Sequence, residues 1–299
     1  MIASERETRT MAPLPPEETR RQVQRIVDLP TLPIVVSQVL SLVEDHRASA
    51  GDLAKVIGSD QALASRVLRL ANSAFYGFRR EIVTISHAVV LLGFDTVKSI
   101  VLATSVFETL NGGTEGSSFD QEQFWLHVGA TALAARQVAK NLRLADPETA
   151  FVGGLLHDIG KVVLDRFFHQ RYAEAARRAV ETPCLIREAE VSLFGVDHSE
   201  VGRWLADRWR FPVTIVEPVS FHHRPGEAGV DHRGLASIVH LADILTRNAQ
   251  IGSGGDGLIP LPDAEVLQRL KIGAADLLRW TEELAEGREA VEAYLQVAH

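Results

Sequence analysis

The segment Phe151–Phe168, FVGGLLHDIGKVVLDRFF, places ionisable side chains among residues that a helix would bury. Apolar residues surround most of its helical circumference, yet it also carries His157, Asp158, Lys161 and Asp165. Removing ionised Asp and Lys from water is costly unless each finds a partner. A divalent cation is one such partner, because it attracts imidazole and carboxylate ligands together. A buried ion pair without metal is the alternative.

A single helix over residues 147–168 is the simplest interpretation of this apolar pattern. On such a helix consecutive residues lie about 100° apart, so His157 and Asp158 can flank one ion. Lys161 follows His157 by about one turn and shares its face. We therefore expect the pair and the lysine to act together.

Four further segments supply polar residues from apolar surroundings, which strengthens the metal interpretation: His127, His198, the pair His222–His223, and Asp243. His222 and His223 end a predicted helix, so an alternative role for them is to interact with the helix dipole. Asp243 lies in the apolar run IVHLADIL with no evident basic partner nearby. Its burial therefore also favours a cation.

The rest of the chain predicts an all-α fold. Aromatic residues make up only 6% of the sequence, and no stretch alternates with the period of a strand. Good N-cap residues predict helix starts at Ser49, at Ser59 or Asp60, and at Asp120. Gly93 is a helix-stop signal.

Two glycine-rich loops, Asn111–Ser118 and Gly252–Pro262, divide the chain. The N-terminus is polar and bears prolines, which is typical of a mobile segment. The expected segments are a mobile tail (1–20), an N-terminal helical subdomain (21–112), a second helical subdomain with the His/Asp residues (119–250) and a C-terminal helical extension (263–299).

Charge and cysteine content limit the classes of function. The formal net charge of −8 argues against nucleic-acid binding by the molecule as a whole. Cys184 is the single cysteine, so no intramolecular disulfide can form, and a reducing cytoplasm is the expected location. No apolar run approaches the ~18 residues that a membrane span requires, so no membrane association is expected.

The segment Ser49–Gly77 has the rhythm of a helix-turn-helix, which makes DNA binding an alternative. Basic residues outnumber acidic ones in and just after it: Lys55, Arg66, Arg69, Arg79 and Arg80 against Asp52 and Asp60. A solvated helical face is the commoner explanation for such residues, and the acidic chain agrees with it. Nucleic acid is therefore not the expected partner.

The order of the motifs resembles two related families. The pattern H…HDIGK…H…HH…D, from His127 to Asp243, resembles the HD superfamily of metal-dependent phosphohydrolases, especially its HD-GYP branch of cyclic-dinucleotide phosphodiesterases. The first block resembles HDOD proteins, a regulatory relative of that branch. Four motifs carry this second resemblance: LPTLPIVVSQVL (Leu29–Leu40), DLAKVIGSD (Asp52–Asp60), LRLANSAFYG (Leu68–Gly77) and ISHAVVLLG (Ile85–Gly93).

The resemblance implies an N-terminal HDOD subdomain and an HD-like subdomain with two metal ions. Asp158 and Lys161 are the implied catalytic residues: Asp158 would bridge the ions, and Lys161 would contact a substrate phosphate. The implied ligands are His127, His157, Asp158 and Asp243 for one ion, and His198, His222, His223 and Asp158 for the other. Such ligands suit iron, manganese, nickel, cobalt or zinc.

Two departures from the HD-GYP pattern shape the expected function. Gln123 stands where proteins with a third metal carry Glu, so at most two ions are expected. The GYP signature is absent after the paired histidines, where the sequence reads HHRPGEAGVDHRG (His222–Gly234). We therefore expect a bacterial HDOD-type signalling or regulatory protein that retains the metal centre, not an efficient cyclic di-GMP phosphodiesterase.

The expected partners of such a protein are a nucleotide or phosphate ligand and another signalling protein. An active metal-dependent phosphohydrolase acting on a nucleotide or other phosphoester is the main alternative, because the ligand set is complete. A DNA-binding regulator is the third.

Overall fold

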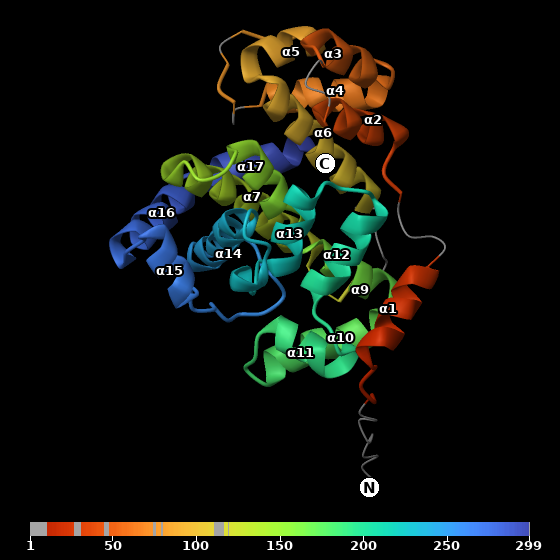
Figure 1. Cartoon of the computed structure of the whole chain (residues 1–299), viewed down its shortest axis with the longest axis vertical. Helices are drawn as coiled ribbons and strands as arrows, with labels where there is room; N and C mark the ends of the chain where they lie inside the picture. Colours follow the sequence, from red (N-terminus) through yellow and green to blue (C-terminus); the bar gives the residue numbers. More distant parts are fainter. Residues whose placement is uncertain are drawn as a thin grey trace, which may run out of the picture.

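The computed structural model describes residues 11–26, 31–44, 48–73, 76–78, 80–110, 117–118 and 120–298. Every regular element within these ranges is helical, so the predicted all-α fold class is confirmed. Figure 1 shows a group of N-terminal helices at one end of the long axis and a larger group beyond it. No described helix combines the length and hydropathy that a bilayer crossing requires.

The N-terminal group packs its helices around an apolar core. Its second helix begins with a capping box, in which Asp52 N donates to Ser49 Oγ at 3.2 Å and Ser49 N donates to Asp52 Oδ2 at 3.0 Å. Asp60 caps the next helix by accepting from Leu63 N at 3.0 Å. Gly93, at φ 89°, ends the fourth. These helices are α2 (Ile34–Glu44), α3 (Ala50–Gly58), α4 (Gln61–Ala71), α5 (Ile85–Leu92) and α6 (Phe94–Leu110).

The larger group surrounds α7, which contacts α8, α14 and α17. The close approach of α7 and α8 requires Gly154, because a Cβ there would lie 2.8 Å from the Cα of Ala132. α17 also contacts α4 and α6, so the C-terminal extension joins the two groups. The helices are α7 (Gln121–Leu142), α8 (Pro147–Leu156), α9 (Ile159–Phe167), α10 (His169–Glu181), α11 (Ile186–Phe194), α12 (His198–Arg208), α13 (Val213–Phe221), a 3-10 turn (Pro225–Glu227), α14 (Arg233–Asn248), α15 (Ala264–Leu270), α16 (Ala274–Glu286) and α17 (Arg288–Ala298).

The prediction of one helix over residues 147–168 is wrong, because two helices meet at the His157–Asp158 pair. Asp158, with φ −98° and ψ 8°, leaves the helical conformation there. Gly160 explains the turn: the start of α9 lies so close to α12 that a Cβ at Gly160 would overlap the carbonyl oxygen of His198. The chain therefore bends to place α9 against α12 while α8 remains against α7.

The expected mobile tail is only partly within the described residues, which begin at residue 11. The helix α1 (Pro16–Arg25) starts inside the expected tail. Leu14 N donates to Leu193 O at 2.9 Å. The buried Thr19 Oγ1 donates to Phe194 O at 2.7 Å. α1 thus packs beside α12 and far from the N-terminal group (Figure 1). The expected boundary at residue 20 falls within this helix.

Candidate metal centre

The His157–Asp158 pair occupies the helix junction with both side chains buried, at 0% and 1% exposure. His157 Nδ1 donates to the carbonyl oxygen of Gly154 at 2.7 Å, which leaves Nε2 as the free ring nitrogen. This Nε2 lies 3.3 Å from Asp158 Oδ2 without the geometry of a hydrogen bond. The two side chains therefore face one point without sharing a proton, as ligands of one ion do.

One group of three possible ligands joins His157 to His127 of α7 and Asp243 of α14. Their ligand atoms lie within 4.8 Å of one another, and all three residues are buried. His127 Nε2 is 3.2 Å from Asp243 Oδ1 and 3.5 Å from Asp158 Oδ2. Two ligand atoms that each lie about 2.1 Å from one ion are about 3.0–3.4 Å apart. These separations therefore suit a shared cation.

A second group consists of His198, His222 and His223, whose ligand atoms also lie within 4.8 Å of one another. His198 Nε2 and His223 Nε2 are 2.9 Å apart. His222 Nδ1 donates to Val219 O at 2.9 Å, which leaves its Nε2 for the centre. His198 begins α12, and the histidine pair follows α13, so helix ends bring this group together.

Asp158 lies between the two groups. Its Oδ2 faces His127 and His157, whereas its Oδ1 is 3.0 Å from His198 Nε2. A carboxylate with one oxygen toward each group has the position of a bridging ligand. The structure brings together all seven residues that the resemblance implies as ligands: His127, His157, Asp158, His198, His222, His223 and Asp243.

The charges around the centre favour ionised carboxylates. Burial alone would raise the pKa of Asp158, but His157 and Lys161 outweigh it and hold that pKa well below its usual range. Burial is likewise outweighed at Asp243, chiefly by the guanidinium of Arg247, and the pKa again lies well below the ordinary value. Both side chains therefore present the deprotonated form that a metal ligand needs.

Burial keeps most of the imidazoles neutral. It lowers the pKa of His127 and brings those of His222 and His223 well below the ordinary value. His198 differs: burial opposes its protonation, but Glu190, whose Oε2 is 2.6 Å from Nδ1, raises its pKa to about 9. A carboxylate at Nδ1 orients the ring and increases the basicity of Nε2 toward a metal.

Three of the ligand nitrogens have no hydrogen bond to any described residue. They are Nε2 of His127, His157 and His222, and all three are buried. A buried polar atom left unpaired costs roughly 1–3 kcal/mol. The mixed set of imidazoles and carboxylates therefore fits a divalent transition metal such as iron, manganese, nickel, cobalt or zinc.

Lys161 lies beneath the centre at 1% exposure. Its Nζ donates to Asp158 Oδ2 at 2.7 Å and to Gly254 O at 2.6 Å. The ammonium group therefore orients Asp158 and ties the glycine-rich loop 252–262 to the centre.

Asp243 has a basic partner, contrary to the expectation from sequence. Arg247 Nε lies 3.0 Å from Asp243 Oδ1, and Arg247 Nη1 lies 3.0 Å from Asp256 Oδ1 in the glycine-rich loop. The spacing of four residues on one helix is a signal that could have revealed this pair. Glu190, by contrast, belongs to α11 and meets His198 only through the packing of the fold.

A cavity of about 220 Å³ opens onto the centre. His223 and Asp243 lie in its wall beside the guanidinium groups of Arg187 and Arg247. Guanidinium groups bind phosphate and carboxylate oxygens in bidentate geometry. The cavity is therefore suited to a small anion next to the metal ligands.

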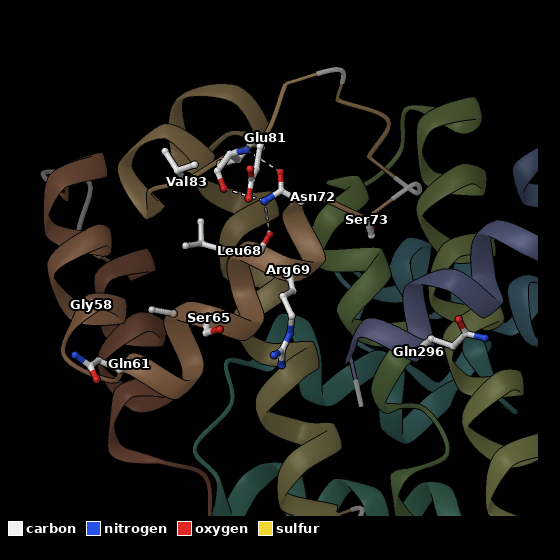
Figure 2. Close-up of a pocket in the computed structure, with 12 residues that line it drawn as sticks. Gly58, Gln61, Ser65, Leu68, Arg69, Asn72, Ser73, Glu81, Val83 and Gln296 are labelled. Atoms are coloured by element: carbon white, nitrogen blue, oxygen red, sulfur yellow. Dashed lines mark hydrogen bonds between the residues drawn. The ribbon is translucent and has the colours of Figure 1, made fainter.

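The N-terminal group carries an open groove of about 820 Å³, but little positive charge lines it (Figure 2). Arg69 of α4 lies in its wall, together with the acidic Glu81. Arg66 of the same helix pairs with Glu108 at 2.6 Å. Arg79 lies outside the described residues. Of the basic residues that suggested DNA binding, Arg66 is therefore already paired, and Arg69 lies beside an acidic residue.

Two solved structures of similar proteins cover nearly the whole chain. An HDOD domain protein with unknown function from Geobacter sulfurreducens has a TM-score of 0.77 and 25% identity, over 94% of this chain and 97% of that one. A protein from Shewanella amazonensis SB2B named "Putative phosphohydrolase" has a TM-score of 0.72 and 28% identity, over 93% of this chain and 97% of that one. Both likenesses agree with an HD-like helical fold.

Sequence relatives give the family. An uncharacterized protein of Treponema pallidum (strain Nichols) is 26% identical over 227 residues, which are 75% of this chain and 43% of that protein. The chain thus spans less than half the length of this relative. The HDOD domain family matches residues 29–225, which takes in the N-terminal group and most of the candidate metal centre. The chain belongs to the HDOD domain family.

Proposed function

We propose that this chain is a cytoplasmic bacterial signalling protein whose retained His/Asp centre holds two divalent metal ions and binds a phosphate-bearing ligand. The observation that carries the proposal is the position of Asp158, with one carboxylate oxygen toward each group of three ligands. The family match and the phosphohydrolase-named relative support it. Another signalling protein would receive the signal.

The cavity at the centre favours a small ligand. Its volume of about 220 Å³ lies below the roughly 300–1,000 Å³ typical of clefts that bind drug-sized molecules. Inorganic phosphate or the phosphate group of a monoester suits this space better than a whole cyclic dinucleotide. Arg187 would bind its oxygens, and Lys161 would hold Asp158 in place.

An active phosphohydrolase is the second candidate, and the bridging position of Asp158 favours it. Two ions at such a centre would supply Lewis-acid activation of a phosphoester and of water. The contacts of two residues favour a regulatory role over a catalytic one. Lys161 is occupied by Asp158 and Gly254, and Arg247 is occupied by Asp243 and Asp256. The groups best placed to stabilise a transferred phosphate are therefore engaged in structural contacts.

Metal content tests the centre directly. Protein purified from metal-replete cells should contain about two transition-metal ions per chain by elemental analysis, the number that a bridged site holds. The Asp158→Ala variant should lose at least one of them. Asp165→Asn is the matched control, because Asp165 is equally buried but binds Ser117 and Ser118 instead. A chain without stoichiometric metal, or equal loss in both variants, would contradict the proposal.

Turnover separates the two candidates. The metal-loaded protein is assayed for phosphate release from p-nitrophenyl phosphate and from nucleoside monophosphates with added Mn²⁺. A regulatory centre gives the same low release in the wild type and in Asp158→Ala. Release that is fast in the wild type and absent in Asp158→Ala would instead establish the phosphohydrolase.

A further inference from the structure

A second cavity, of about 400 Å³, lies where α1 and α12 meet the end of α13. Two bonds place α1 there, since Thr19 Oγ1 donates to Phe194 O and Arg208 Nη1 donates to Ile26 O. Three cationic, two acidic and two aromatic side chains dominate its wall: Arg20, Arg203, Arg224, Glu200, Asp207, Trp204 and Phe221. We call it the arginine cavity.

The three arginines of this cavity have unfilled hydrogen-bonding capacity. Arg203 approaches Asp207 at 3.9 Å, and Arg224 approaches Asp197 at 3.9 Å and Glu227 at 3.7 Å, all longer than a hydrogen bond. Arg20 forms no ion pair within 4.0 Å among the described residues, although its positive charge, like those of Arg203 and Arg224, acts on Glu200. Each guanidinium offers five N–H donors, and like charges around one space repel. An anion with several oxygens would satisfy the donors and remove the repulsion.

The aromatic side chains point to more than an inorganic anion. Trp204 and Phe221 are half-buried and come from neighbouring helices, α12 and α13. A nucleic-acid base stacks favourably on such a ring. A simple phosphate would gain nothing from either side chain.

The two carboxylates that line the cavity, Glu200 and Asp207, also fit this ligand. They would repel a bare phosphate, so a phosphate-only site does not explain them. A base with an exocyclic amino group supplies N–H donors that a carboxylate accepts, as Glu and Asp do from cytosine. The cavity thus has one set of residues for phosphates and another for a base.

We propose that the arginine cavity binds a nucleotide, with its phosphates held by Arg20, Arg203 and Arg224 and its base against Trp204 and Phe221. A volume of about 400 Å³ lies within the range of small-molecule sites and is nearly twice that of the cavity at the metal centre. The site is lined by residues other than the candidate metal ligands, and it does not depend on metal being bound at the centre.

Residues that line the arginine cavity are neighbours in sequence of the candidate metal ligands. Phe221 directly precedes the pair His222–His223, and Arg224 directly follows it. Glu200 lies two residues after His198, in the first turn of α12. A nucleotide in the cavity therefore contacts residues on both sides of the second group of metal ligands. It is placed to act as an effector of that group.

Binding of GDP, used as a probe, tests the assignment by isothermal titration calorimetry on the full chain as purified. The Arg203→Ala/Arg224→Ala variant should bind GDP about tenfold more weakly or worse, because each lost charge-assisted hydrogen bond removes a contact of the phosphates. Both arginines are about half exposed, at 47% and 45%, so the variant should keep the wild-type melting temperature. Trp204→Ala should weaken GDP binding and leave that of pyrophosphate unchanged.

Arg279→Ala is the matched control, because Arg279 of α16 is an exposed arginine, at 57%, that lines neither the arginine cavity nor the cavity at the metal centre. It should bind GDP as the wild type does. Three results would each overturn the proposal: no detectable GDP binding to the wild type, GDP binding by the double variant as tight as by the wild type, or GDP binding by Trp204→Ala as tight as by the wild type. The metal content of the same preparations reports on the metal centre independently.

Discussion

The N-terminal group and the larger group bury different kinds of side chain. α4 of the N-terminal group turns Leu63, Val67 and Leu70 inward, and its N-cap residue Asp60 stays at the margin. In the larger group several helix ends are buried, and these carry ionisable residues, among them Asp158 at 1% exposure. One group is thus stabilised mainly by apolar burial, whereas the other contains charges that depend on precise partners.

The difference lies in where the helices end. A helix end exposes backbone groups and suits a polar side chain, so it normally faces water. Here α8 and α9 meet in the interior, and α13 ends against α14. The polar residues that finish these helices are held in one small volume, where a cation can satisfy them together. Comparable residues in the N-terminal group cap their own helices, as Ser49 and Asp60 do.

Two glycines give the largest expected contrast between the groups. Gly160→Ala would drive a Cβ into the carbonyl of His198, so it should lower the free energy of unfolding by roughly 5 kcal/mol or more, or prevent folding. Gly58→Ala, at the end of α3 with no atom within 4 Å of the new Cβ, should raise it by about 0.5–1 kcal/mol. Urea unfolding followed by circular dichroism measures both. Similar small changes in the two variants would refute the tight α9–α12 contact.

Two arginines give the next contrast. Arg247 is 7% exposed between Asp243 and Asp256, and Arg247→Met would leave both carboxylates without the guanidinium that pairs with them. Breaking a buried pair in this way costs about 3–5 kcal/mol. Arg66→Met removes a pair whose partner Glu108 is 51% exposed, so the cost should be about 0–1 kcal/mol. If Arg247→Met and Arg66→Met lowered the free energy of unfolding equally, the buried ion pairs of Arg247 would contribute no more to stability than the exposed pair of Arg66.

The same contrast explains what the sequence could predict. Caps such as Ser49 and Asp60 are local, so their types predict the helix starts directly. The start of α1 has a local signal as well, because Pro16 is followed by Glu17 and Glu18 in the first turn. We expected a mobile tail there because the segment is polar and bears prolines.

The candidate ligands could be recognised from their spacing and family resemblance. The helix break at His157–Asp158 and the contact between Glu190 and His198 could not be predicted. The break between α8 and α9 is not visible in the apolar pattern, since hydrophobic residues continue on both sides of His157–Asp158. It results from the contact of Gly160 with α12, which forms only in the folded chain. The role of Glu190 was not predicted for the same reason, because Glu190 belongs to α11 and contacts His198 of α12 only in the folded chain.

Two N-cap residues, Ser49 and Asp197, give the smallest expected difference in stability between the two groups of helices. Ser49→Ala removes an exposed cap of α3 and should lower the free energy of unfolding by about 1 kcal/mol without changing the metal content. Asp197→Ala removes the cap of α12, where Asp197 accepts from Ser199 N at 3.1 Å and from Glu200 N at 3.3 Å. The loss of stability should be similar, about 1–2 kcal/mol.

Metal content should separate these two variants even though their stabilities do not. Asp197 is 4% exposed and immediately precedes His198, so a frayed start of α12 would displace a candidate metal ligand. Ligand displacement of this kind typically weakens metal binding about 10–100-fold. Elemental analysis after dialysis against a weak chelator should therefore show metal lost from Asp197→Ala and kept in Ser49→Ala. Equal retention would mean that the start of α12 is held by Glu190 and by its packing on α9 alone, and that the cap does not contribute to the centre.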